Sequence, residues 1–214
     1  MRHFLFIAIA LISWAASAQT PAERADLDID DIRTFRLLSG KPALVGRITG
    51  IFRQLERTAG VEGRFRVLVT NAPTFASAES HANGVIVITE SFAAFPDADI
   101  AFVLAHELAH ESLDHPRLQA LLSDQLRGDE STSSFQMRVV FGLLPPEVTN
   151  RLRQDESSAD ALACRWVQEA AYHFDAERFF ARLTKEPSAS PQGSPSHPSY
   201  AQRITDLKAS GCAR

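Results

Sequence analysis

The most informative stretch of the chain runs from Ile100 to His110 and reads IAFVLAHELAH. The residues from Ile100 to Ala105 are all apolar, so the segment favours a helix that is buried in the core. His106 and His110 lie four residues apart and therefore project from one face of that helix. Two neutral imidazoles at this spacing bind one tetrahedral zinc ion at about 2.0–2.1 Å each. The stretch predicts a buried helix that carries two zinc ligands.

Glu107 directly follows the first of these histidines. A carboxylate at this position is placed to take a proton from a water that the metal activates and to pass it to a leaving amine. Catalytic zinc sites keep three protein ligands and one open position. The sequence therefore predicts Glu107 as a general base, and it requires a third ligand further along the chain.

Glu156 is the better candidate for the third ligand, because it begins a Glu-Ser-Ser-Ala-Asp run in a second long helical segment. Asp160 then lies one turn later on the same face. A carboxylate there is suited to accept the free ring N–H of a ligating histidine, which fixes the tautomer of that histidine. The alternative is that Asp155, Glu156 and Asp160 are solvated charges at a helix start. The two-histidine helix favours Glu156 as the ligand.

His115 is a second candidate for the third ligand. The related His-x-x-Gly-x-x-His arrangement needs a glycine turn and one more residue of spacing, and both are missing here. We therefore expect His115 to be a packed or hydrogen-bonded histidine that closes the helix.

The rest of the chain reads as an α+β domain, with a small sheet among more numerous helices. Alternation and β-branched residues predict two strands separated by a loop of small residues, and helix-like spacing predicts the remaining segments. The strands are Arg64–Thr70 and Val85–Thr89, the loop is Asn71–Gly84, and the helices are Leu27–Leu38, Leu44–Thr58, Arg117–Leu126, Pro146–Ala171, Asp175–Leu183 and Tyr200–Ser210. The Pro- and Ser-rich segment Pro187–Pro198 is expected to be a loop rather than a linker between domains.

The N-terminus has the features of a signal peptide. Arg2 and His3 precede an apolar run from Phe4 to Trp14, and Ala16-Ser17-Ala18 follows as a cleavage site. We expect residues 1–18 to be removed and residues 19–214 to form a single domain outside the cytoplasm, without a stable transmembrane segment. The alternative is an uncleaved membrane anchor.

Composition and charge exclude some classes of function. The 214 residues are 45% hydrophobic and 22% charged, as in an ordinary globular protein. A formal net charge of -4 gives no basic surface for nucleic acid. The two cysteines, Cys164 and Cys212, would form a disulfide or remain free thiols, and the sequence leaves both alternatives open.

Several motifs in a fixed order resemble metallopeptidase family M48, a family of HExxH zinc peptidases. HELAH follows a β-branched strand, Glu-x-x-Ala-Asp lies on a later helix, and Ser196-His197-Pro198-Ser199 and Arg203 come after it. The resemblance covers Phe65 to Lys208. It implies a zincin-like fold of the gluzincin type, with a small mixed sheet beside the HExxH helix, and one Zn²⁺ ion per chain.

The resemblance also implies roles for individual residues. His106, His110 and Glu156 would hold the zinc, Glu107 would be the base, and Asp160 would orient a ligand. Arg203 would lie near the active site and stabilise the oxyanion of a tetrahedral intermediate. His197 would reach the metal as a regulatory plug of the open position.

The strand Val85–Thr89 would be the edge strand with which substrate backbone pairs, and it also fits an ordinary core strand. One departure is that Ala76-Ser77-Ala78 stands where many members have Asn-Ala-Phe, which affects substrate contacts rather than the metal site.

The function expected from these features is a zinc-dependent endopeptidase in the periplasm. The resemblance implies unfolded or misassembled proteins as substrates, a role in protein quality control and, by analogy, partners at the outer membrane. The alternative is a zinc-stabilised periplasmic chaperone or scaffold whose proteolytic activity is latent or absent. A closed structural zinc site fits poorly, because such sites favour cysteine ligands.

Overall fold

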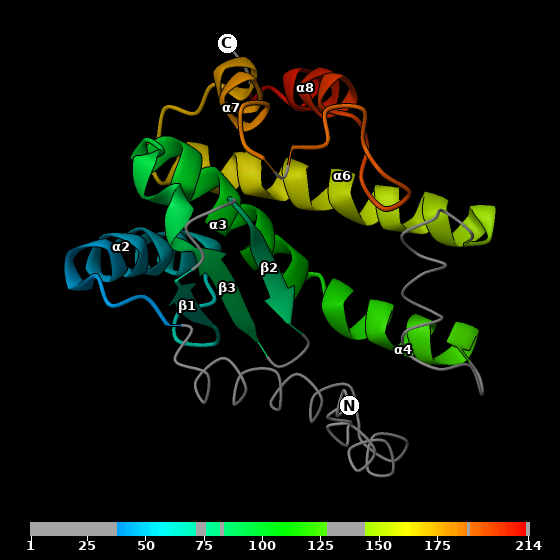
Figure 1. Cartoon of the computed structure of the whole chain (residues 1–214), viewed down its shortest axis with the longest axis horizontal. Helices are drawn as coiled ribbons and strands as arrows, with labels where there is room; N and C mark the ends of the chain where they lie inside the picture. The colour runs from blue at the N-terminus through cyan, green and yellow to red at the C-terminus, as the bar shows by residue number, and fades with distance from the viewer. Residues whose placement is uncertain (1–37, 72–75, 82–83, 128–143, 188, 213–214) are drawn as a thin grey trace, which may run out of the picture.

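The computed structural model describes residues 38–71, 76–81, 84–127, 144–187 and 189–212. Helices dominate, and three short strands form one mixed sheet (Figure 1), so the predicted α+β class is confirmed. The predicted signal peptide and the predicted helix Leu27–Leu38, except for Leu38 itself, lie outside these residues. The elements are α2 (Pro42–Ala59), β1 (Arg66–Thr70), β2 (Ala78–His81), β3 (Val85–Thr89), a 3₁₀ turn (Glu90–Ala94), α3 (Asp97–Ser112), α4 (His115–Arg127), α6 (Pro146–Glu169), α7 (Ala176–Leu183) and α8 (Tyr200–Ala209).

The strand Val85–Thr89 is the central strand of the sheet, so the edge position implied by the resemblance is wrong and the alternative of an ordinary core strand is confirmed. β3 pairs in parallel with β1 and antiparallel with β2, and all five of its residues are buried. A continuous β-branched run of this kind is typical of a strand covered on both faces. Within the described residues, β2 is the edge strand on the other side of β3 from β1. It lies inside the segment that the sequence predicted to be a loop.

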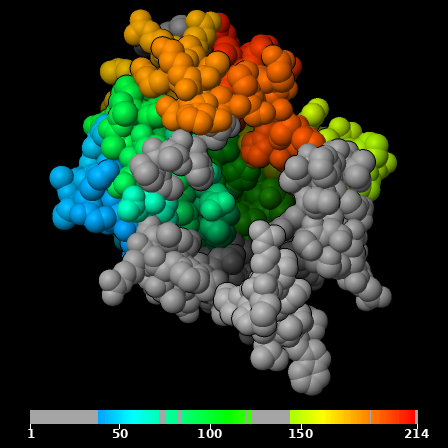
Figure 2. Space-filling view, in the orientation of Figure 1, coloured from blue at the N-terminus to red at the C-terminus, as the bar shows by residue number. Residues whose placement is uncertain are grey.

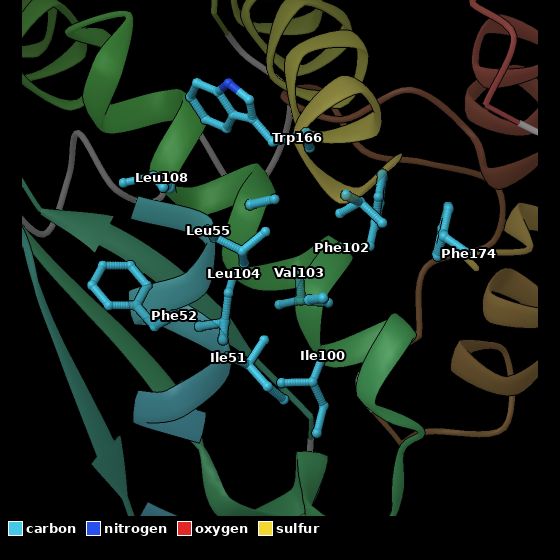
Figure 3. Packing of buried hydrophobic residues seen from close by; sticks show 14 of the residues in the cluster. Ile51, Phe52, Leu55, Ile100, Phe102, Val103, Leu104, Leu108, Trp166 and Phe174 are labelled. Carbon is cyan, nitrogen blue, oxygen red and sulfur yellow. The ribbon is translucent and has the colours of Figure 1, made fainter. Parts of the chain in front are cut away.

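Helix α3 runs through the middle of the molecule. Figure 1 shows α2 and the sheet on one side of it and α6 on the other, with α7 and α8 beyond α6. Every residue of α3 from Asp99 to His110 is buried, as expected for a helix that is enclosed on all sides. Leu55 of α2 and Leu104 of α3 lie together in this core, and the rings of Phe102 and Phe174 stack with centroids 4.0 Å apart (Figure 3).

The chain turns sharply between α3 and α4. Asp114 has a φ angle of 62°, a left-handed conformation that Asp and Asn adopt more readily than most residues. The turn ends α3 at Ser112 and allows a new helix to start at His115. His115 therefore begins α4, and it does not close the HELAH helix as predicted.

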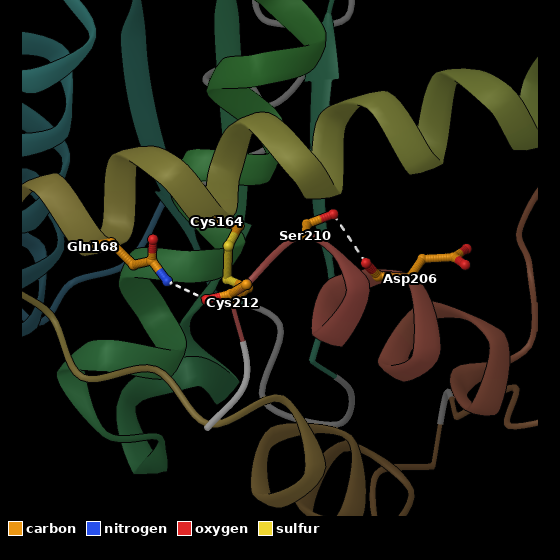
Figure 4. Close-up of a disulfide and its surroundings, with 6 residues drawn as sticks. Cys164, Gln168, Asp206, Ser210 and Cys212 are labelled. Atoms are coloured by element: carbon orange, nitrogen blue, oxygen red, sulfur yellow. Dashed lines mark hydrogen bonds between the residues drawn. A yellow bond between two sulfur atoms is a disulfide. The ribbon is translucent and has the colours of Figure 1, made fainter.

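A disulfide joins α6 to the segment that follows α8, which decides between the two alternatives left open by the sequence. Cys164 and Cys212 are bonded, with Cα atoms 5.5 Å apart, and both side chains are buried (Figure 4). Gln168 of α6 donates a hydrogen bond of 2.8 Å to the carbonyl of Gly211 beside the bridge. The C-terminal end of the described chain is thus fixed to α6.

Candidate metal centre

Two helices bring three potential metal ligands to one point. The Nε2 atoms of His106 and His110 on α3 lie 3.1 Å apart. Glu156 of α6 faces both of them, with Oε2 3.5 Å from His106 Nε2 and Oε1 3.3 Å from His110 Nε2. Within the described chain, these three residues form the group whose ligand atoms all lie within 4.8 Å of one another. The three predicted ligands are therefore brought together.

The donor set and its spacing fit zinc. Ligand atoms about 2.0–2.1 Å from a tetrahedral centre lie about 3.3 Å from one another, close to the three distances between these donors. All three side chains are buried. Oε2 of Glu156 has no hydrogen-bond partner in the described parts of the chain, and a cation among the three residues would give this oxygen one.

The charges around the three residues also favour a cation. Burial opposes a charge on His106, yet the carboxylates of Asp160 and Glu156 raise its pKa to about 10. Burial likewise disfavours the ionised form of Glu156, but contacts with His106 and His110 hold the pKa of that carboxyl well below its usual range. The site thus retains the Glu156 carboxylate and favours positive charge at His106, and a metal ion would compete with the proton for that place.

The second ring nitrogen of His106 faces Asp160, as the sequence predicted. Nδ1 lies 2.9 Å from Oδ1 of Asp160. Arg203 of α8 donates two hydrogen bonds to the same carboxylate, from Nε at 2.8 Å and from Nη2 at 2.6 Å. Burial raises the pKa of Asp160, but the charge of Arg203 and the contact with His106 outweigh it, so the pKa is lowered. Arg203 does lie at the site, where its guanidinium binds this carboxylate and lies over the ring of Phe180.

The second ring nitrogen of His110 faces another imidazole. Nδ1 of His110 lies 3.1 Å from Nδ1 of His115, and Nε2 of His115 lies 3.5 Å from Oδ1 of Asp155. Arg151 donates a hydrogen bond of 2.9 Å to that same oxygen. His115 and Asp155 are both buried. His115 is therefore packed and hydrogen-bonded, as predicted, but its contacts with His110 and Asp155 were not predicted from the sequence.

Two hollows flank the metal-ligand group, and Glu107 lines both. The larger hollow has a volume of about 360 Å³ and extends between α4 and α6, where Leu122, Val148 and Leu152 line it. The smaller hollow has a volume of about 220 Å³ and is lined by Phe102, Phe179 and Tyr200, among others. Ala78 of β2 borders both hollows. In Figure 2, part of α3 is recessed between β2 and the C-terminal segment.

His197 lies on the loop that crosses between the two hollows, and it lines both. Its Nε2 is 3.5 Å from Oε1 of Glu156, while its Nδ1 is 2.8 Å from the hydroxyl of Ser196. Its side chain is 54% exposed. Gly193, with a φ angle of +81°, allows the loop to close tightly, since a Cβ there would lie 2.7 Å from the carbonyl oxygen of His197. His197 is thus held at the mouth of the site, outside the three-residue ligand group.

The sequence model of Peptidase family M48 matches residues 45–210. The match spans α3, α6 and α8, and so includes every side chain of the site named above. No curated protein sequence matches the chain. None of the helices in the described residues combines the length and the hydropathy that a membrane span requires.

Proposed function

The chain belongs to peptidase family M48, and from this we propose that it is a zinc-dependent endopeptidase of extracytoplasmic protein quality control. One observation carries the proposal: His106, His110 and Glu156 converge within 4.8 Å of one another, and Glu107 stands beside them on the same helix. Two imidazoles and one carboxylate form a donor set typical of catalytic zinc in peptidases. We propose one zinc ion per chain.

Zinc at this site would supply a Lewis acid for the scissile carbonyl and for the attacking water. Glu107 would accept a proton from that water and deliver it to the leaving amine. The position of Glu107 supports this role, because its side chain lines both hollows. A peptide that occupies the two hollows would have its scissile bond beside this carboxylate. Since Glu107 is not among the three grouped ligands, its carboxylate is available for proton transfer.

The edge strand β2 supports an extended peptide as the substrate. The carbonyl of Ser77 accepts a hydrogen bond from the amide of Thr89. In an antiparallel pair the backbone groups alternate in direction, so the N–H and C=O groups of Ala78 and Ser80 point away from β3. Their backbone groups are suited to pair with an added strand. Hollows on both sides of the ligand group leave room for residues before and after the scissile bond, which favours cleavage inside a chain. Unfolded or misassembled proteins present such segments.

Arg203 would add positive charge near the smaller hollow, where it is one of the lining residues. We propose that this charge helps to stabilise the oxyanion that forms during hydrolysis. Two of its nitrogens are already engaged by Asp160, so its position is fixed before any substrate binds.

The periplasm is the compartment we propose. The signal-peptide features of residues 1–18 support export. The bond between Cys164 and Cys212 supports an oxidising environment. Partners at the outer membrane are proposed only by analogy with the family.

A second function, a zinc-stabilised chaperone or scaffold with latent activity, is favoured by one specific contact. His197 directs Nε2 toward Glu156, and the hydroxyl of Ser196 holds the other side of its ring. An imidazole in this place is positioned to occupy the open coordination site. The two functions differ in whether the purified chain turns over a substrate.

The experiment is hydrolysis of casein by purified residues 19–214, with zinc content measured on the same sample and with Glu107→Gln as the matched variant. We expect about one zinc per chain in both proteins and internal cleavage by the wild type only. Stoichiometric zinc without cleavage in either protein would favour the chaperone. Loss of zinc in the variant would show that Glu107 was assigned the wrong role.

A further inference from the structure

The contacts of His110 beyond the metal-ligand group form a chain of four side chains. It starts at His110 on α3, passes through His115 at the first position of α4, and reaches Asp155 and Arg151 on α6. Three helices therefore meet at one row of polar groups, in which His110, His115 and Asp155 are buried and Arg151 reaches the surface. Buried polar groups that are not paired cost free energy, so a row of this kind requires an explanation beyond filling space.

The hydrogen-bond donors and acceptors along the row can be assigned in only one order, from His110 toward Asp155. When Nε2 of His110 binds a metal, its Nδ1 carries the ring proton and must donate. Nδ1 of His115 is the acceptor at 3.1 Å, so the proton of a neutral His115 sits on Nε2. That Nε2 faces Asp155, whose carboxylate only accepts. Arg151, which only donates, completes the row. Each group has the donor or acceptor that its neighbour requires.

We propose that His115 and Asp155 are positioning residues that fix the tautomer and ring orientation of His110 for metal binding. The inference deepens the proposed function and rests on its assignment of His110 as a ligand. A hydrogen-bond acceptor on the far nitrogen raises the basicity of an imidazole ligand and restrains its ring. The acceptor for His110 is a second imidazole backed by a carboxylate.

The local structure explains how these residues meet. The left-handed turn at Asp114 ends α3 and directs His115 back toward His110. On α6, Asp155 and Glu156 are neighbours in sequence, so their side chains diverge by about 100° around the helix. Glu156 faces the two histidines while Asp155 faces His115. One turn of α6 therefore supplies a ligand and orients another ligand.

The test uses His115→Phe, which keeps an aromatic ring but removes both nitrogens, and His115→Gln, which restores an acceptor. Asp114→Asn is the matched control, because it changes an exposed residue of the same turn and Asn tolerates the left-handed conformation. Zinc affinity is measured by competition with a chromogenic chelator. The visible spectrum of the cobalt-substituted protein reports the ligand geometry, and thermal unfolding of the zinc-free protein reports the fold.

We expect His115→Phe to weaken zinc binding about 10–100-fold and to shift the cobalt spectrum, with the zinc-free protein still folded. His115→Gln should recover part of the affinity, and Asp114→Asn should equal the wild type. If His115→Phe does not fold, Asp155→Asn serves in its place, with a smaller loss of affinity in the same direction.

Wild-type affinity and an unchanged cobalt spectrum in a folded His115→Phe protein, or in a folded Asp155→Asn protein, would overturn the positioning role alone. Failure of the wild-type chain to bind zinc would overturn the proposed function together with this inference. Zinc binding without proteolysis in the wild type would leave the affinity comparison intact and count against the peptidase only.

Discussion

The two histidines that we propose as metal ligands are held in different ways. His106 contacts the carboxylate of Asp160 directly, and Asp160 forms an ion pair with Arg203, whose side chain is only 12% exposed. His110 is backed by an imidazole, and its support ends at Arg151, which is 55% exposed. Both supports depend on α6, through Asp160 in the first case and Asp155 in the second.

The difference indicates which half of the site is the more rigid. A buried bidentate pair loses less to solvent screening than a contact with a half-exposed side chain. The support of His106 is also strengthened covalently, since Cys164 lies one turn after Asp160 on α6 and is bonded to the chain just beyond α8, the helix that carries Arg203. We therefore expect substitutions in the contacts of His106 to lower zinc affinity and stability more than substitutions in the contacts of His110.

The largest combined effect on zinc affinity and stability is expected from Asp160→Asn. The change removes the carboxylate beside His106 and leaves Arg203 without its ionic partner, so both metal binding and folding suffer. Zinc affinity should fall at least about 10–100-fold, and the free energy of unfolding should fall by about 3 kcal/mol. Chelator competition and denaturant unfolding measure the two losses. A smaller loss of affinity than in Asp155→Asn would reverse the comparison.

Arg203→Met sharpens the comparison, because it removes the guanidinium that binds Asp160 and leaves the contact between Asp160 and His106 in place. Asp160 then remains as a buried carboxylate without its guanidinium, and we expect a loss of about 2–3 kcal/mol in stability with zinc still bound. In a double-mutant cycle with Asp160→Asn, the stability loss of the double variant should be about 1–3 kcal/mol smaller than the sum of the losses of the two single variants. Strict additivity would mean that Arg203 does not act through Asp160.

The paired change Cys164→Ala with Cys212→Ala tests the covalent part of the support. The bridge closes a loop with a sequence separation of 48, and its loss should lower the free energy of unfolding by about 2–4 kcal/mol, mainly by releasing the unfolded chain. Zinc affinity should change little, because no ligand or contacting carboxylate is altered. Loss of zinc in a folded double variant would show that the bridge also sets the geometry of the site.

The smallest effect on stability is expected from His197→Ala, because the side chain is about half exposed and lies outside both supports. Stability should change by no more than about 0.5 kcal/mol, zinc should be retained, and kcat should be unchanged or higher if the residue is a plug. Gly193→Ala is the companion variant, since a Cβ there displaces the same loop without removing the imidazole. A large fall in kcat with zinc retained would point to a direct role in hydrolysis.

The sequence predicted the parts of the site that follow from local periodicity. The four-residue spacing of His106 and His110 places them on one face of any helix, and the four-residue step from Glu156 to Asp160 does the same on α6. The structure confirms that these residues meet. Family membership, read from the order of short motifs, is confirmed over residues 45–210.

Contacts that depend on tertiary structure were not predictable in the same way. The role of His115 depends on a left-handed turn at Asp114, which no spacing rule reveals. The strand β2 has the sequence AESH, with neither β-branched residues nor a clear apolar face, and it forms because β3 offers it an edge. The edge position of Val85–Thr89 was implied by the family resemblance, whereas the uniform burial of this strand agrees with the alternative of a core strand.

The central claim is that His106, His110 and Glu156 together hold one catalytic metal ion. The most direct test is a crystal structure of Glu107→Gln with data collected at the zinc absorption edge, because this variant should keep the metal without degrading itself. The account predicts one anomalous peak per chain about 2.0–2.2 Å from a nitrogen of each histidine and an oxygen of Glu156. A zinc peak elsewhere, or one that excludes Glu156, would contradict it.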